Sequence, residues 1–202
     1  RGPMTMGASQ LCGFAKSDPS RATPNLQFHI QPISTDKLGG ANLHDFHAFT
    51  PTVANIRPTS RGEISISSSD TKVNPKIKMN YLSTDEDRKV AADGIKLIRK
   101  IVMETNEFKK YEPKEFRPGS HLNEKEEIVK ACSHYAQTIF HPVGTCKMGS
   151  DESAVVSDKL KVHGLNKLRV IDASIMPNIT SGNTNAPTIM IAEKGTDMIL
   201  NP

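Results

Sequence analysis

A histidine followed directly by a proline, His141-Pro142, lies in the string FHPVGTCKMG at residues 140–149. An imidazole titrates close to neutral pH, so His141 is the type of residue that can remove a proton from a hydroxyl group. Because a proline disfavours helical backbone in the residue before it, a preceding helix should end here. Taken alone, a histidine before a proline is more often a residue at a helix end, so its chemistry depends on its context.

A second string, SGNTNAP at residues 181–187, consists of small and polar residues and precedes an apolar stretch. Pro187 suits the first position of a helix, because the N–H that proline lacks has no partner there. We therefore predict a helix from Pro187 to Ile199. The run LRVID at residues 168–172 predicts a strand that ends in an acidic residue. A strand, a small-residue loop and a helix in this order present backbone N–H groups to a ligand.

Four residues of metal-binding type, Cys132, His134, His141 and Cys146, follow one another in this region. Their spacing, C-x-H-x6-H-x4-C, matches no zinc pattern, and a metal would occupy the imidazole needed for proton transfer. We therefore predict no metal site. The remaining histidines are expected on the surface or in strands; they are His29, His44, His47, His121 and His163.

The first half of the chain predicts strands joined by turns. Residues 25–30 alternate between apolar and polar side chains, as in a half-buried strand. Further strands are expected at residues 53–56, and at 64–67 and 76–79 after turn-like sequences. Short strands connected in this way favour an antiparallel sheet. Residues 1–24, which are rich in glycine, proline and small side chains, are expected to be irregular.

The sequence pattern then changes to a helical period. Ser83 and Glu86 have the spacing of a capping box, and apolar residues at three- and four-residue steps predict an amphipathic helix that ends near Glu104. A second helix is predicted to begin at Asn123, with Glu126 three positions on. Its inward side chains are expected to be Ile128, Val129, Cys132 and Tyr135. We expect both helices to cover one face of the sheet.

Composition narrows the class of protein. Hydrophobic residues make up 36% and charged residues 24% of 202 residues, as in an ordinary globular protein. The formal charge of +4 is spread along the chain without a basic block, so we predict no nucleic-acid partner. Three scattered cysteines suit a reducing compartment. We expect a cytoplasmic location and leave peripheral membrane association open. The start at Arg1-Gly2-Pro3 suggests a piece of a longer protein, in which any targeting signal would lie upstream.

Five strings together resemble the glucose–methanol–choline (GMC) oxidoreductases. They are RPTSRG at 57–62, NYL at 80–82, the histidine string at 140–149, LRVIDASIMP at 168–177 and SGNTNAPTIMIAE at 181–193. They follow the family's order and spacing. The resemblance implies FAD as the cofactor. The family's phosphate-binding G-x-G-x-x-G turn is not in this sequence, so we expect an N-terminal FAD-binding half to be missing and this chain alone not to hold FAD.

The resemblance also implies roles for individual residues. His141 would be the base that takes the hydroxyl proton, or would stabilise the developing alkoxide. Asn183 matches the position opposite this base, where its amide could hold the substrate oxygen; the alternative is that it only supplies a turn conformation. The expected cofactor-binding residues are Asn185, Ala186 and Thr188 beside the flavin ring and Asp172 and Ala173 near the ribityl and phosphate portion. For Asp172 and Ala173, a plain strand-to-loop turn is the alternative.

The sequence patterns predict an α+β fold, and the resemblance implies that it has two parts. Residues 1–140 would form a substrate-binding domain, an antiparallel sheet with helices on one face. Residues 141–202 would be a strand and helix segment that returns to an FAD-binding α/β domain. The implied reaction is oxidation of a primary alcohol, such as choline, to an aldehyde with hydride transfer to FAD. A hydroxynitrile lyase of the same fold and a non-catalytic substrate-domain module are the alternatives, and the final electron acceptor stays open.

Overall fold

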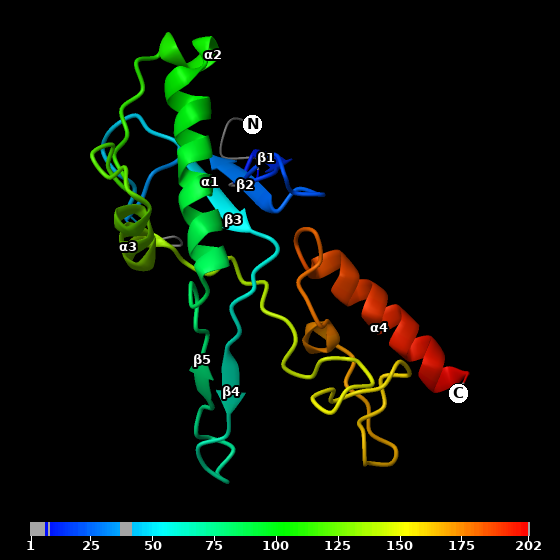
Figure 1. Cartoon of the computed structure of the whole chain (residues 1–202). Helices are drawn as coiled ribbons and strands as arrows, with labels where there is room; N and C mark the ends of the chain where they lie inside the picture. Colours follow the sequence, from blue (N-terminus) through cyan, green and yellow to red (C-terminus); the bar gives the residue numbers. More distant parts are fainter. Residues whose placement is uncertain (1–6, 8, 37–41, 202) are drawn as a thin grey trace. The chain divides into compact units, whose positions relative to one another are not determined.

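The computed structural model describes residues 7, 9–36 and 42–201, and in these residues the chain divides into two compact units. The first unit is made of Arg1–Thr59 and Leu82–Gln137, and the second of Ser60–Tyr81 and Thr138–Pro202. Both contain antiparallel pairing together with helices, so the predicted α+β class is confirmed (Figure 1). The break after Gln137 lies close to the predicted boundary after residue 140, whereas no sequence pattern placed 60–81 with the C-terminal part.

The first unit is built on a three-stranded antiparallel sheet. Its strands are β1 (Leu11–Ala15), β2 (Leu26–Gln31) and β3 (Thr50–Asn55), with β2 in the middle. The prediction that residues 1–24 are irregular is wrong for β1; residues 1–6 and 8 lie outside the described part. The sequence LCGFA has no β-branched residue, and its strand conformation comes from pairing with β2, for instance Cys12 with His29.

Helix α1 (Asp85–Glu104) packs against β3 and covers the sheet (Figure 1). Its N-cap is Thr84 rather than the predicted Ser83: the Thr84 side chain accepts a hydrogen bond from the backbone N–H of Asp87. The core beneath it contains Leu26, Phe28 and Val90 at 1%, 8% and 1% exposure. The apolar face that the sequence predicted for this helix is therefore the face that lies on the sheet.

Two further helices complete this unit, the single turn α2 (Asn106–Lys109) and α3 (Lys125–Tyr135). A capping box joins Glu124 with Glu127 at the start of α3, one residue later than the predicted pair Asn123 and Glu126. Ile128 is fully buried, and α3 packs against α1. Tyr135, the last residue of the helix, was expected to point inward but is 52% exposed.

The loop between α2 and α3 is tied to α1 by one arginine. Arg99 forms a two-pronged ion pair with Glu115, with both N···O distances 2.9 Å, and also donates to the carbonyl of Leu122 at 2.7 Å. Both charged side chains are largely buried, at 17% and 11% exposure. A planar guanidinium suits this arrangement because it donates in several fixed directions.

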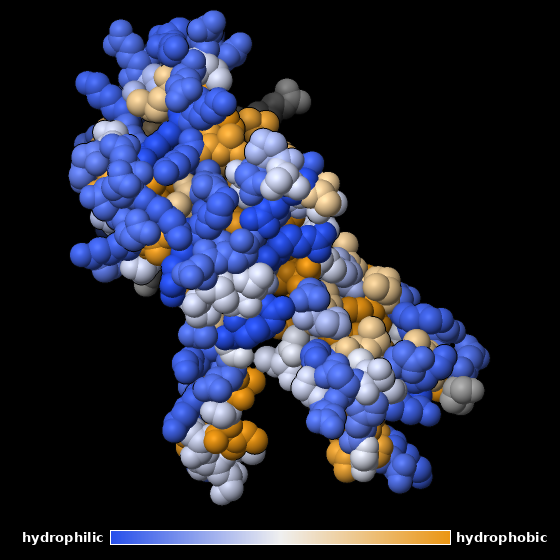
Figure 2. Space-filling model, in the orientation of Figure 1, coloured by the Kyte–Doolittle hydropathy of each residue, from blue (hydrophilic) through white to orange (hydrophobic). Residues whose placement is uncertain are grey.

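The second unit begins with the hairpin β4 (Glu63–Ser65) and β5 (Lys76–Lys78), which forms a sheet of its own rather than extending the first. Ile64 pairs with Ile77 across the hairpin, and both side chains are at least half exposed. Figure 2 shows hydrophobic side chains at the surface of this hairpin.

The rest of the second unit has little regular structure before its last helix. Its elements are the 3₁₀ turn η2 (Ala173–Ile175) and α4 (Asn185–Leu200). The strand predicted at 168–172 is wrong: in the described residues this run forms one isolated bridge, between Lys161 and Arg169. A run of strand-forming residues becomes a strand only where a neighbouring segment pairs along its length. The core of this part consists of five buried residues, Val156, Leu160, Ile175, Met176 and Ile191.

Helix α4 begins at Asn185, two residues earlier than predicted. Pro187 is its third residue rather than its first. This position still lies in the first helical turn, where backbone N–H groups have no partner within the helix, so the proline is tolerated.

Candidate active site

The second unit brings His141 and the loop before α4 together. Nε2 of His141 lies 2.7 Å from the side-chain nitrogen of Asn183, 42 residues along the chain. Nδ1 of the same ring lies 2.8 Å from Oγ1 of Thr184. His141 is half-buried and Asn183 is exposed, so one edge of this pair faces solvent while the ring is held from behind.

The segment that carries His141 is fixed by backbone hydrogen bonds to η2. The N–H of Cys146 donates to the carbonyl of Ser174 at 3.0 Å, and that of Met148 donates to Ile175 at 2.8 Å. Between His141 and these bonds the chain turns at Gly144, whose φ of +92° suits glycine. The string at residues 140–149 is therefore held at its C-terminal end by its backbone hydrogen bonds to η2.

The start of α4 fixes the other half of the site. Thr184 is the N-cap residue and is 7% exposed. Both the backbone N–H and the hydroxyl of Thr188 donate to its carbonyl, at 3.0 and 2.6 Å. Further along the helix, Gly195 lies against Ile171, so α4 packs closely on the segment that leads into η2.

The residues expected to bind the cofactor lie on two elements that touch, η2 and α4. Asn185 and Ala186 are exposed in the first turn of α4, whereas the hydroxyl of Thr188 points back to Thr184. Asp172 is the N-cap of η2: its carboxylate accepts from the backbone N–H of Ser174 at 2.8 Å and from its hydroxyl. The carboxylate thus has a structural partner, and the cofactor roles stay predictions.

Sequence reasoning missed Thr184, although it stands between two residues that were singled out. A hydroxyl residue directly before a helix is the usual N-cap type and was the available signal. Placing the helix start at Pro187 concealed it.

A charged turn follows the histidine segment. The carboxylate of Asp151 accepts a hydrogen bond from the Ser153 hydroxyl. It also forms an ion pair with Lys147, whose Nζ lies 3.0 Å from the carboxylate oxygens. The Ser153 hydroxyl, followed by the Lys147 ammonium, lowers the pKa of Asp151 from 3.8 to about 2. Asp151 is therefore charged at neutral pH and closes the turn that follows Met148.

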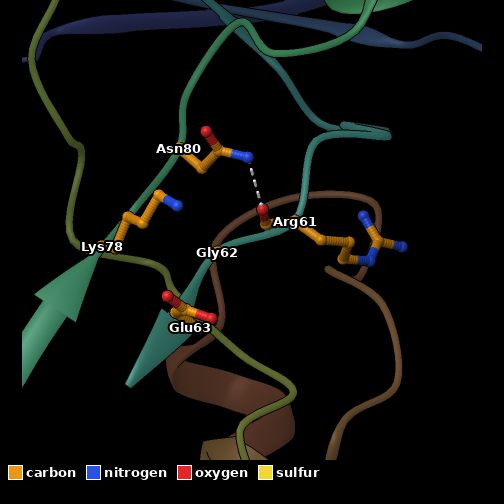
Figure 3. A pocket seen from close by; sticks show the side chains of 5 residues that line it. All are labelled: Arg61, Gly62, Glu63, Lys78 and Asn80. Carbon is orange, nitrogen blue, oxygen red and sulfur yellow. Dashed lines mark hydrogen bonds between the residues drawn. The ribbon is translucent and has the colours of Figure 1, made fainter. Parts of the chain in front are cut away.

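A separate small hollow lies at the base of the β4–β5 hairpin. It has a volume of about 130 Å³ and is lined by Arg61, Gly62, Glu63, Lys78 and Asn80 (Figure 3). The side chain of Asn80 donates to the carbonyl of Arg61 at 3.0 Å, as the dashed line in Figure 3 marks. The hollow shares no residue with the His141 site, and its walls are charged and polar.

Two features are absent from the described residues, a metal site and a membrane-spanning helix. Among residues 7, 9–36 and 42–201, no three histidine, cysteine or acidic side chains gather as a metal site would require. Within the same part of the chain, no helix combines the length and apolar character needed to cross a membrane.

Comparison with known proteins identifies the family. The sequence profile described as "GMC oxidoreductase" matches residues 58–192. An alcohol dehydrogenase [acceptor] of Pseudomonas putida is 42% identical over 99% of this chain and 36% of its own length. An oxygen-dependent choline dehydrogenase of Proteus mirabilis (strain HI4320) is 43% identical over 93% of this chain and 33% of its own length. This chain therefore spans about a third of these relatives.

Solved structures agree with the sequence comparison. Pyridoxine 4-oxidase from Mesorbium loti superposes with a TM-score of 0.84 and 27% identity, covering 96% of this chain and 38% of the oxidase. A formate oxidase gives a TM-score of 0.85 and 27% identity, covering 98% of this chain and 39% of its own. With the profile match over most of the sequence and relatives above 40% identity, this chain belongs to the GMC oxidoreductase family.

Proposed function

We propose that this chain is the C-terminal part of an FAD-dependent enzyme that oxidises a primary alcohol to an aldehyde. The observation that carries the proposal is the 2.7 Å approach of His141 Nε2 to the Asn183 amide. This approach places a proton acceptor, the imidazole of His141, beside the exposed amide of Asn183. The alcohol and choline dehydrogenases among the relatives support the same class of substrate.

In this proposal His141 takes the hydroxyl proton. Oxidation removes a proton from the alcohol oxygen and a hydride from the adjacent carbon, which leaves a carbonyl group. FAD, when bound, supplies the acceptor for the hydride. His141 can accept the proton at Nε2, because this nitrogen lies on the edge of the ring that faces Asn183.

Asn183 would hold the alcohol oxygen beside that nitrogen. An amide N–H donates without taking up a proton, so it can bind the oxygen without competing with the base. As the proton leaves, negative charge grows on the oxygen and the hydrogen bond from the amide strengthens. A donor that is already in place when charge develops is an effective source of transition-state stabilisation.

The start of α4 has the chemistry needed beside a flavin ring. Its N-cap makes no side-chain hydrogen bond to the first turn, and Asn185 and Ala186 are exposed there. Backbone N–H groups at a helix N-terminus favour negative charge on a ligand. We therefore propose that Asn185, Ala186 and Thr188 lie along the ring, with Asp172 and Ala173 nearer the ribityl and phosphate portion.

The proposal requires a longer protein. These 202 residues contain no G-x-G-x-x-G turn to hold a pyrophosphate, and the chain spans about a third of its relatives. In that protein, residues 1–140 would serve as the substrate-binding domain and residues 141–202 would complete the FAD-binding domain. An N-terminal segment would supply the phosphate-binding turn.

The decisive experiment uses that longer, flavin-loaded protein and replaces His141 with alanine. Loss of a general base lowers turnover of a primary alcohol by about 10²–10⁴-fold, while the bound flavin should persist because other segments hold it. His134→Ala, an exposed histidine on α3, is the matched control and should keep normal turnover. Near-normal turnover in His141→Ala would remove His141 from the mechanism.

Two further measurements limit the alternatives. Anaerobic addition of a series of primary alcohols, including choline, should bleach the flavin; a flavin that stays oxidised while the substrate is converted indicates a lyase instead.

Titration of FAD into the 202-residue chain should show weak binding or none. Submicromolar binding by the chain alone would contradict the need for another phosphate-binding segment.

A further inference from the structure

Thr184 is a buried polar residue of the site to which the proposed reaction gives no role. It is 7% exposed and stands at the N-cap of α4. An N-cap hydroxyl normally accepts a hydrogen bond from a backbone N–H in the first turn of its own helix. The Thr184 side chain makes no such bond, and its Oγ1 lies instead 2.8 Å from Nδ1 of His141. The hydroxyl therefore serves the imidazole rather than the helix.

The hydrogen-bond partners on the two sides of the ring define where its proton lies. The side-chain nitrogen of Asn183 can only donate, so Nε2 of His141, 2.7 Å away, must accept. In a neutral imidazole the other nitrogen then carries the hydrogen, and Nδ1–H donates to Oγ1 of Thr184. The backbone N–H of Thr184 also points at Nδ1, but from 3.4 Å, beyond the usual range of about 2.7–3.2 Å. The nearer hydroxyl can either donate or accept, so it can accept the Nδ1–H hydrogen that the Asn183 amide implies.

We infer that Thr184 is a positioning residue that holds His141 in the Nδ1–H tautomer and thereby keeps a lone pair on Nε2. The inference rests on the proposed function, in which Nε2 accepts the proton of the alcohol. Nδ1 stays protonated throughout, so the Thr184 hydroxyl accepts the same hydrogen bond before and after the transfer. A catalytic histidine in the wrong tautomer is costly: in a serine protease it lowers turnover by about 10⁴-fold.

The helix makes Thr184 a rigid support. Its carbonyl receives the N–H and the hydroxyl of Thr188, at 3.0 and 2.6 Å, which fix its backbone at the first turn. A β-branched side chain also has few rotamers. Valine at this position therefore keeps the shape while it removes the acceptor, and serine keeps the acceptor while it removes the methyl group.

The test measures the tautomer directly on the 202-residue chain. Long-range ¹H–¹⁵N correlation spectra of the ¹⁵N-histidine-labelled chain, recorded at a pH where the ring is neutral, distinguish a ring nitrogen with a lone pair from one that carries hydrogen. The signal of His141 is assigned as the one that disappears in His141→Gln. We expect the Nδ1–H form in the wild type. In Thr184→Val the ratio of Nδ1–H to Nε2–H should fall by about 2- to 10-fold, the effect of one neutral hydrogen bond. Thr184→Ser should restore it.

Thr196→Val is the matched control, since its hydroxyl bonds Ala192 on the same helix at 2.9 Å and the tautomer should not change. An Nε2–H ring in the wild type, or an unchanged ratio in folded Thr184→Val, overturns the inference. If the valine variant unfolds, an Nε2–H ring in the wild type or in Thr184→Ser still overturns it. The two proposals fail separately: turnover that survives His141→Ala refutes the function, whereas the tautomer ratio tests only the role of Thr184.

Discussion

A methyl group added at Gly195 tests how closely α4 packs on the segment before η2. A Cβ built at this position would lie 2.5 Å from Cγ2 and 2.9 Å from Cδ1 of Ile171. Real Cβ atoms do not approach other atoms so closely, so either the isoleucine or the helix must shift. The substitution thus places two opposing effects at one position, a gain in helix propensity and a loss in packing.

The two effects have comparable magnitudes. Alanine is favoured over glycine in a helix interior by about 0.8–1 kcal/mol. Overpacking a close contact costs about 1–3 kcal/mol. We therefore expect Gly195→Ala to lower the free energy of unfolding by roughly 0–2 kcal/mol. In an Ile171→Ala background the overlapping atoms are gone, so the same substitution should raise it by about 1 kcal/mol.

The assay is urea unfolding followed by far-UV circular dichroism, because the chain has no tryptophan to report by fluorescence. Ala192→Gly, at an exposed position of the same helix, measures the propensity contribution alone and should cost about 1 kcal/mol. The four chains with and without each substitution at positions 171 and 195 form a double-mutant cycle. Equal effects of Gly195→Ala in both backgrounds would show that α4 does not lie against Ile171 as described.

Three further predictions concern other contacts. Arg99→Lys keeps the charge but loses the two-pronged bond to Glu115, so it should lower the free energy of unfolding by about 1.5–3 kcal/mol in the same urea assay. Ile128→Ala removes a fully buried side chain and should cost about 2–5 kcal/mol, also by urea unfolding. Ser153→Ala should raise the pKa of Asp151 from about 2 toward 3.8 in a carboxyl ¹³C titration. Because the folded pKa is depressed, the stabilisation exists above about pH 4 and is lost as the pH falls toward 2.

Helical periodicity made the helices the most predictable part of the fold. The apolar steps of α1 and the Asn123–Glu126 spacing place both helices within two residues of their observed starts. Strands were less predictable, because pairing decides them. The sequence LCGFA of β1 became a strand through its neighbour β2, whereas LRVID at 168–172 forms one isolated bridge in the described residues.

The candidate site shows a similar division. Resemblance to a family singled out His141 and Asn183, but nothing in a separation of 42 residues says that the two side chains meet. Their approach depends on the packing of η2 against α4 and on the backbone bonds of Cys146 and Met148. Thr184 escaped notice because the helix start was placed at Pro187, and because its hydroxyl contacts His141, which is distant in the sequence.

The interleaved course of the chain has a consequence for its synthesis. The hairpin within Ser60–Tyr81 belongs to the same unit as Thr138–Pro202, yet the whole of Leu82–Gln137 is made in between. At about 5–20 residues per second, a ribosome needs roughly 3–11 s to make these intervening residues. A lone two-stranded hairpin is marginally stable in water, and this one carries exposed isoleucines. Until Thr138–Pro202 has followed, the hairpin therefore has only its own strand pairing to stabilise it.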